Sequence, residues 1–156
     1  MEITGLPLHP LVVHAAVVFT PLAAALAVAF AVVPRWRYLT RWPLAVTTVA
    51  ALLSVWVSRM SGESLLDSRP ELRQLIHTHE QRAETLSLLM IGFTVVVAVA
   101  VWGVGGPSGL LSGRGARETR VAVLDKLMPA LLIVGAVAVL AWVGLTGDAG
   151  SRAVWG

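Results

Sequence analysis

Four long apolar segments divide this 156-residue chain, and only the second contains an acidic or basic side chain other than histidine, Arg59 near its end. The segments cover residues 11–33, 43–60, 85–104 and 127–145. About 20 apolar residues in a helix cross the hydrocarbon core of a bilayer. Inside that core every backbone N–H and C=O must be bonded within the protein, which an α-helix achieves by itself. The sequence therefore predicts an all-α protein, a four-helix transmembrane bundle that forms one integral membrane domain over residues 1–156.

The composition excludes a typical soluble domain and several kinds of chemistry. Hydrophobic residues make up 56% of the chain and charged residues 13%, against roughly 45–50% and 25% in soluble proteins. Cysteine is absent, so disulfides, thiolate metal ligands and a cysteine nucleophile are excluded. His79-Glu80 begins like a zincin helix, but Ala83 occupies the position of the second histidine. Since Ser, Lys and Asp show no catalytic spacing either, we expect a protein that is not an enzyme.

Basic residues are concentrated in the two segments that follow the first and third spans. They are Arg35, Arg37 and Arg41 after the first, and Arg114, Arg117, Arg120 and Lys126 after the third. They do not form one basic stripe interleaved with aromatic residues, so no nucleic-acid partner is expected. Lys and Arg that flank a span are retained on the cytoplasmic side. We therefore expect a lipid bilayer as the surroundings, cytoplasmic loops at these two segments, and both termini outside.

All four histidines fall at the predicted outer ends of the first and third spans: His9, His14, His77 and His79. His14 lies inside an otherwise apolar segment, where an ionisable side chain is costly and needs a partner. At about 100° per residue, His9 and His14 point about 140° apart, and His77 and His79 about 200° apart. One site can therefore take one histidine from each helix. We predict His14 and His79 as the cofactor-binding pair, with His9 and His77 nearer the rim.

Acidic residues accompany these histidines. The third helix is expected to be long, beginning at the capping box Ser68–Glu71 and carrying an amphipathic first part. Within that part His77, Glu80 and Glu84 share one face. Gly62, after the second span, is interpreted as a helix C-cap with Glu63 solvated beside it.

A resemblance to a known family joins these features. An Ala/Val-rich span follows directly on the segment Gly5-Leu6-Pro7-Leu8-His9-Pro10-Leu11-Val12-Val13-His14, and a glycine-acid pair follows the second span. Over nearly its whole length the chain resembles a bacterial membrane family catalogued as domain of unknown function 2231, although Ala83 stands where that family commonly has glycine. The matching positions are His9, His14, Gly62, Glu63, His79 and Glu84. The resemblance implies the bacterial cytoplasmic membrane, and, because some relatives are joined to Rieske-type redox domains, electron transfer with a redox partner protein.

Two hypotheses of different classes follow. In the first, His14 and His79 bind haem b at the extracytoplasmic face, since two neutral imidazoles suit bis-histidine ligation inside a helix bundle. A variant of it is copper or zinc, held by His9, His14, His79, Glu63 and Glu84. In the second, the protein is a structural or accessory membrane protein without a cofactor, and its histidines and glutamates form a hydrogen-bond network that locks helix ends together.

Overall fold

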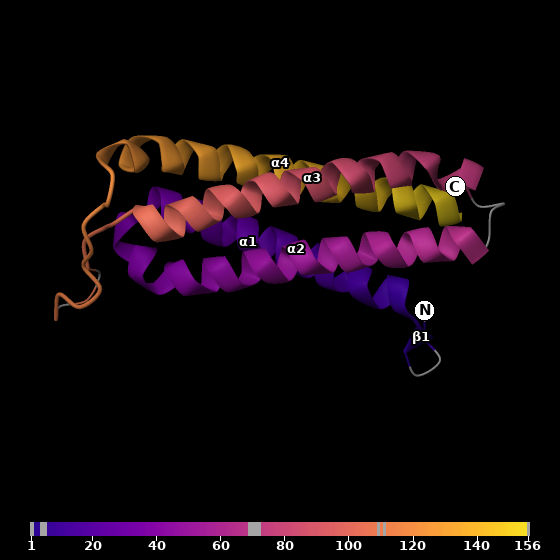
Figure 1. Ribbon diagram of the computed structural model, residues 1–156, viewed down its shortest axis with the longest axis horizontal. Helices are drawn as coiled ribbons and strands as arrows, with labels where there is room; N and C mark the ends of the chain where they lie inside the picture. The colour runs from indigo at the N-terminus through magenta and orange to yellow at the C-terminus, as the bar shows by residue number, and fades with distance from the viewer. Residues whose placement is uncertain (1, 4–5, 69–72, 109, 111, 156) are drawn as a thin grey trace.

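A computed structural model describes residues 2–3, 6–68, 73–108, 110 and 112–155 (Figure 1). The described residues form four long helices, α1 (Leu8–Val32), α2 (Arg37–Ser68), α3 (Arg73–Gly103) and α4 (Ala122–Trp155). A 3-10 helix, η1 (Pro34–Trp36), joins the first two, and a short antiparallel pair of strands, β1 (Glu2–Ile3) and β2 (Leu6–Pro7), precedes α1. The predicted all-α four-helix bundle is confirmed.

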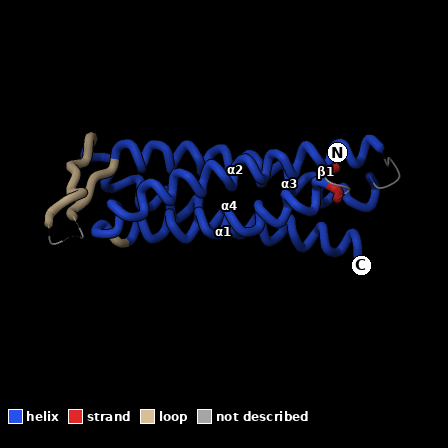
Figure 2. The backbone as a smooth tube through the Cα atoms, turned by 90° about the horizontal axis from the view of Figure 1, so that it is seen from below, coloured by secondary structure: helices blue, strands red, loops and turns tan. Residues whose placement is uncertain are grey.

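The helices pack in a ring in which each one contacts two neighbours: α1 with α2, α2 with α3, α3 with α4, and α4 with α1. Consecutive helices run antiparallel (Figures 1 and 2). The start of α1, the end of α2, the start of α3 and the end of α4 therefore meet at one end. We call this the histidine end, because the helix positions of all four histidines are there. The opposite end, with η1 and the loop of residues 104–121, is the arginine end.

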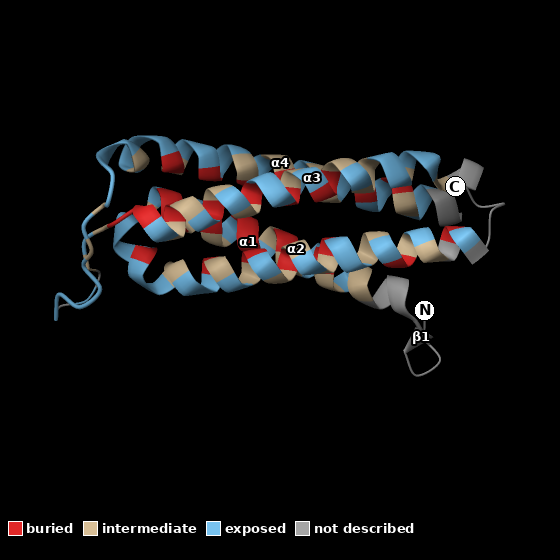
Figure 3. Ribbon diagram, viewed as in Figure 1, coloured by how far each residue is buried: buried red, intermediate tan, exposed pale blue. Residues whose placement is uncertain are grey.

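The distribution of apolar residues is that of a membrane protein. Each long helix contains a stretch that is long and apolar enough to cross a bilayer: Val12–Val32, Pro34–Ser64, Ile76–Gly103 and Ala122–Arg152. Exposed residues face outward along all four helices (Figure 3). Many of them are large and apolar, among them Val18, Leu53, Leu88 and Val134. Contact between water and so continuous an apolar surface is unfavourable, whereas contact with lipid tails is not.

Small residues on α1 allow the close packing of the interior. Ala23, Ala24 and Ala27 have no exposed surface, and Phe30 fills the space toward the arginine end. In lipid, helix association depends on van der Waals contact and not on exclusion of water, so small side chains that let backbones approach are favoured at the interface. The first helix is accordingly a central packing element of the bundle.

The second helix is longer than its apolar segment indicates. It continues through Gly62 to Ser68, so the interpretation of Gly62 as a C-cap is wrong. Two contacts extend the helix: Arg59 pairs with Glu63 one turn later at 3.0 Å, and Leu66 is buried against the bundle. The expectation of a long third helix with a polar first part is confirmed, although the capping box proposed for its start includes residues 69–71, which lie outside the described residues.

Arg37 is buried at the arginine end, and 8% of its side chain is exposed. Its Nε donates to the carbonyl of Phe30 at 3.1 Å, and its Nη1 donates to the carbonyl of Gly105 at 2.7 Å. Nη1 also lies 3.5 Å from a carboxylate oxygen of Asp125. One guanidinium group thus connects the end of α1, the segment after α3 and the first turn of α4.

Two further arginines bind carbonyls in the last turn of α3 and directly after it. Arg41 donates to the carbonyls of Val101 and Val104, and Arg117 donates to that of Trp102 at 2.6 Å. The final carbonyls of a helix have no partners within it and carry the negative end of the helix dipole, which cations stabilise. The arginines that the sequence assigns to membrane topology therefore also cap α3.

Two threonine hydroxyls are buried in the bundle without a hydrogen-bond partner among the described residues. Thr20 and Thr48 have no exposed surface, and the Oγ1 of each is unpaired. The neighbouring Thr47 behaves differently, because its hydroxyl donates to the carbonyl of Pro43 at 2.7 Å. A buried polar group without a partner lowers stability.

The substitution Thr48→Val is therefore expected to raise the free energy of unfolding by about 1 kcal/mol, since it exchanges an unpaired hydroxyl for a methyl group of similar size. Thermal unfolding in detergent measures the effect. Thr47→Val is the matched control on the same helix and should not stabilise the protein. A loss of stability in Thr48→Val would contradict the absence of a partner for its hydroxyl.

Candidate functional site

A cavity of about 160 Å³ lies at the histidine end, between all four helices. Its deeper walls are apolar and consist of one side chain from each helix: Val17, Val55, Leu86 and Val143. Nearer the end of the bundle the lining includes polar side chains, those of Arg59, Glu63, His79, Glu80, Glu84 and Thr146, together with the apolar Leu66 and Ile76. The cavity is therefore apolar at its base and charged at its rim.

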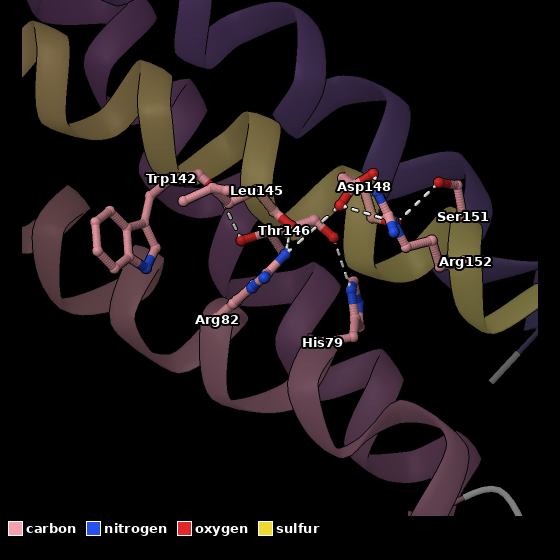
Figure 4. A network of polar contacts seen from close by, with 8 residues as sticks. All are labelled: His79, Arg82, Trp142, Leu145, Thr146, Asp148, Ser151 and Arg152. Atoms are coloured by element: carbon pink, nitrogen blue, oxygen red, sulfur yellow. Dashed lines mark hydrogen bonds and ion pairs between the residues drawn. The ribbon is translucent and has the colours of Figure 1, made fainter. Parts of the chain in front are cut away.

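His79 is held in a fixed orientation at this rim (Figure 4). Its Nδ1 lies 3.0 Å from the backbone carbonyl of Thr146 on α4. A carbonyl can only accept, so Nδ1 carries the proton and donates it. In the neutral imidazole, Nε2 is then the acceptor, with a free lone pair. The contact thus assigns the tautomer of a histidine that lines the cavity.

Glycine at position 150 leaves room for the imidazole ring of His79 beside α4. A Cβ atom there would lie 3.1 Å from Nδ1 and Cε1 of the His79 ring, closer than ordinary van der Waals contact. Gly150 follows Thr146 by one helical turn, so its missing side chain leaves the space in which the imidazole reaches the α4 backbone. The sequence motif that singles out His79 contains no sign of this partner.

A second contact between α3 and α4 lies beside the first. Arg82 donates through Nη1 to the carbonyl of Leu145 at 2.6 Å and lies 3.9 Å from a carboxylate oxygen of Asp148. Asp148 also pairs with Arg152 at 3.0 Å (Figure 4). These contacts lock the start of α3 to the end of α4.

Arg59 connects two of the three carboxylates around the cavity. Its Nε lies 3.0 Å from Glu63 on the same helix, and its Nη2 lies 4.0 Å from Glu84 on α3. Both carboxylates are well exposed, so each pair contributes little to stability. Glu80 has no ion-pair partner among the residues that the structure describes.

The structure brings together some of the predicted site residues and not others. His79, Glu63 and Glu84 line one cavity. His14 on α1 and His77 on α3 are both exposed, and neither is among the described residues that line this cavity. The side chain of His9 lies outside the described part of the chain. Within that part, no three His, Asp or Glu side chains form a group that could hold a metal ion.

Several residues of the site have only weak signals in the sequence, or none. Arg59 could have been found from its four-residue spacing to Glu63 on a helix. The carbonyl of Thr146 and the space at Gly150 have no such signal, because they become significant only once α4 lies against α3. Their distance from His79 along the chain hides the contact from any local pattern.

The chain matches no protein-family model, no curated protein and no solved structure in the comparisons made with each. Its function is therefore inferred from the chemistry of the cavity. The relevant features are the volume, the apolar base, the oriented imidazole and the charged rim.

Proposed function

We propose that this integral membrane protein binds a small, partly apolar ligand in the cavity at the histidine end, with Nε2 of His79 as the principal hydrogen-bond acceptor. The observation that carries the proposal is the cavity itself, which has walls from all four helices and one oriented polar group. Ligand sites in proteins typically combine apolar walls with a few placed polar groups. An apolar cavity of about 150 Å³ takes one benzene molecule, so the volume here suits a ligand of single-ring size.

The expectation of haem b gains no support from this geometry. Bis-histidine ligation requires His14 and His79 to face each other across a porphyrin, yet His14 is exposed and is not among the described cavity residues. The cavity volume of about 160 Å³ is also below the roughly 300–1,000 Å³ of sites for drug-sized ligands. The residues present do not fit the group, and we propose no redox chemistry through it.

Copper or zinc is supported by one feature and opposed by another. A metal-bound histidine commonly donates its second ring nitrogen to a carbonyl, and His79 does so toward Thr146. However, Glu63 and Glu84 face Arg59, and the described residues include no group of three suitable ligands. We therefore rank a small organic ligand before a metal ion.

The charge distribution supports an orientation with the cavity outside. The arginine end holds the basic residues of the two predicted cytoplasmic loops. The described basic residues of the histidine end are fewer: Arg59, Arg73, Arg82 and Arg152. Since basic flanks are retained in the cytoplasm, we propose that both termini and the cavity face the extracytoplasmic side. The resemblance stated above adds the bacterial cytoplasmic membrane to this proposal.

Binding of single-ring probes tests the proposed function. The probes are benzyl alcohol, benzylammonium and benzoate, observed by ligand NMR with the protein in maltoside micelles. We expect at least one to bind and Ala83→Leu to abolish that binding, because Ala83 lines the cavity and a larger side chain fills it. Ala98→Leu, the same change at an exposed position of α3, controls for partition into the micelle.

Absence of binding by all three probes, or equal binding to wild type and Ala83→Leu, would overturn the proposal. The second candidate, a structural or accessory protein, would then be favoured by the contacts of His79 and Arg82 with the carbonyls of α4.

A further inference from the structure

We propose that the cavity selects a positively charged ligand, a small organic ammonium ion with an apolar body. This inference rests on the proposed function and adds the chemical class of the ligand. Three carboxylates, those of Glu63, Glu80 and Glu84, line the cavity together with one guanidinium group, that of Arg59. These three carboxylates outnumber the side chains of the lining that can carry a positive charge, those of Arg59 and His79, so the lining is negatively charged at pH 7.

The position of these groups matches the shape of such an ion. On each helix, the residues that line the cavity further from the end of the bundle are apolar, as with Val17, Val55 and Val143. Glu63 and Glu80 lie at the charged rim, nearer the end of the bundle than these side chains, and both are exposed; Leu66 and Ile76 follow beyond them. An ammonium group at this rim keeps contact with water and carboxylates, while its apolar body occupies the base of the cavity.

The hydrogen-bonding capacity of the rim also favours a donor. Nε2 of His79 is an acceptor in the tautomer that Thr146 selects, and the carboxylates of Glu80 and Glu84 are acceptors only. The hydroxyl of Thr146 donates to the carbonyl of Trp142 at 2.8 Å. Arg59 is the cationic donor of the lining, and it is engaged with Glu63 and Glu84. An ammonium ion supplies the protons that these acceptors need.

Glu80 is the carboxylate most available to the ligand. Arg59 already compensates Glu63 at 3.0 Å and lies 4.0 Å from Glu84, whereas no described residue forms an ion pair with Glu80. An ammonium ion can therefore pair with Glu80 without displacing a cationic side chain of the protein.

The volume of the cavity also separates two sources of an ammonium group. In a phospholipid, a phosphate separates the ammonium group from a glycerol that bears two acyl chains. Such acyl chains do not fit into a cavity of about 160 Å³. A free amine with a single ring or a short branched chain places its charge directly on an apolar body. The geometry therefore points to the free amine.

Comparison of the three single-ring probes, of which benzylammonium and benzyl alcohol are isosteric, tests the charge preference. In uncharged maltoside micelles at low ionic strength, benzylammonium is expected to bind up to about fivefold more tightly than benzyl alcohol, which corresponds to the upper end of the range for exposed ion pairs. Benzoate should bind most weakly, and added salt should reduce the difference. Phosphatidylethanolamine added to the micelles should not displace benzylammonium.

The variant Glu80→Gln should bring the affinity for benzylammonium close to that for benzyl alcohol without loss of thermal stability. Glu118→Gln makes the same change in charge at the arginine end and should leave both affinities unaltered. A preference that survives Glu80→Gln, or tighter binding of benzoate, would overturn the inference. Displacement by phosphatidylethanolamine would overturn the assignment to a free amine.

The outcomes also distinguish the preference for a cation from ligand binding in general. Equal affinities for benzylammonium and benzyl alcohol, both abolished by Ala83→Leu, would overturn the charge preference and leave ligand binding in place. Failure of all three probes to bind would overturn both.

Discussion

Replacement of Arg37 by alanine is expected to lower the free energy of unfolding by about 3 kcal/mol, because the carbonyls it binds are left without their charged donor. The Nε and Nη1 of this buried side chain serve the carbonyls of Phe30 and Gly105, and Nη1 also faces Asp125. The guanidinium also lies over the ring of Phe30, 5.5 Å from its centroid. A single substitution therefore removes contacts with α1, with the loop after α3 and with α4. Unfolding in detergent, followed by circular dichroism, measures the loss.

Two further variants show whether geometry or charge matters. Arg37→Lys keeps the charge but cannot reach two carbonyls through a planar fork, so it should recover only part of the stability. Arg35→Ala removes a neighbouring exposed charge and should change stability by less than about 0.5 kcal/mol. Equal stability of Arg37→Ala and Arg35→Ala would contradict the role given to the buried guanidinium.

Replacement of Gly105 by alanine should destabilise the arginine end by about 2 kcal/mol or more. A Cβ atom at this position would lie 2.2 Å from the carbonyl oxygen of Arg117 and 2.5 Å from the backbone nitrogen of Thr119. Both neighbours are backbone atoms, which cannot rotate away as a side chain does. The change must therefore push apart the two loop segments around Gly106 and Arg117. These two residues exchange backbone hydrogen bonds of 2.8 and 3.0 Å.

A matched glycine provides the control for this prediction. At Gly92, on the exposed side of α3, a Cβ atom would meet nothing within 4 Å. Gly92→Ala is thus expected to be neutral or to stabilise the helix by up to about 1 kcal/mol. Amide hydrogen exchange of residues 104–121 should rise in Gly105→Ala and stay unchanged in Gly92→Ala. Unaltered exchange in both variants would contradict the close backbone contact.

The four helices and their antiparallel order could be predicted because hydrophobicity alone determines them. Long apolar segments must become helices in a bilayer. Each span carries the chain to the opposite side, so consecutive spans run in opposite directions. The end of α2 was placed too early, since the residues beyond Met60 are polar by composition and helical through local pairs such as Arg59 with Glu63.

The candidate site could be predicted in part. The histidines were assigned to one end, and His79, Glu63 and Glu84 do line one cavity there. The direction in which His14 points could not be predicted, because α1 is apolar on nearly every side and its sequence does not distinguish the inner face from the outer one. The partner of His79 is a backbone carbonyl of another helix, and every residue has such a carbonyl.

The peptide segments that connect the four helices are distributed unequally between the two ends of the bundle. At the arginine end two peptide segments, η1 and the loop of residues 104–121, join helices in pairs, and guanidinium groups tie these pairs together. At the histidine end a peptide segment joins α2 to α3, and the side chains of His79 and Arg82 join α3 to α4. The two ends of the bundle therefore hold together differently: backbone connections and guanidinium groups act at the arginine end, and side-chain contacts beside the cavity act at the histidine end.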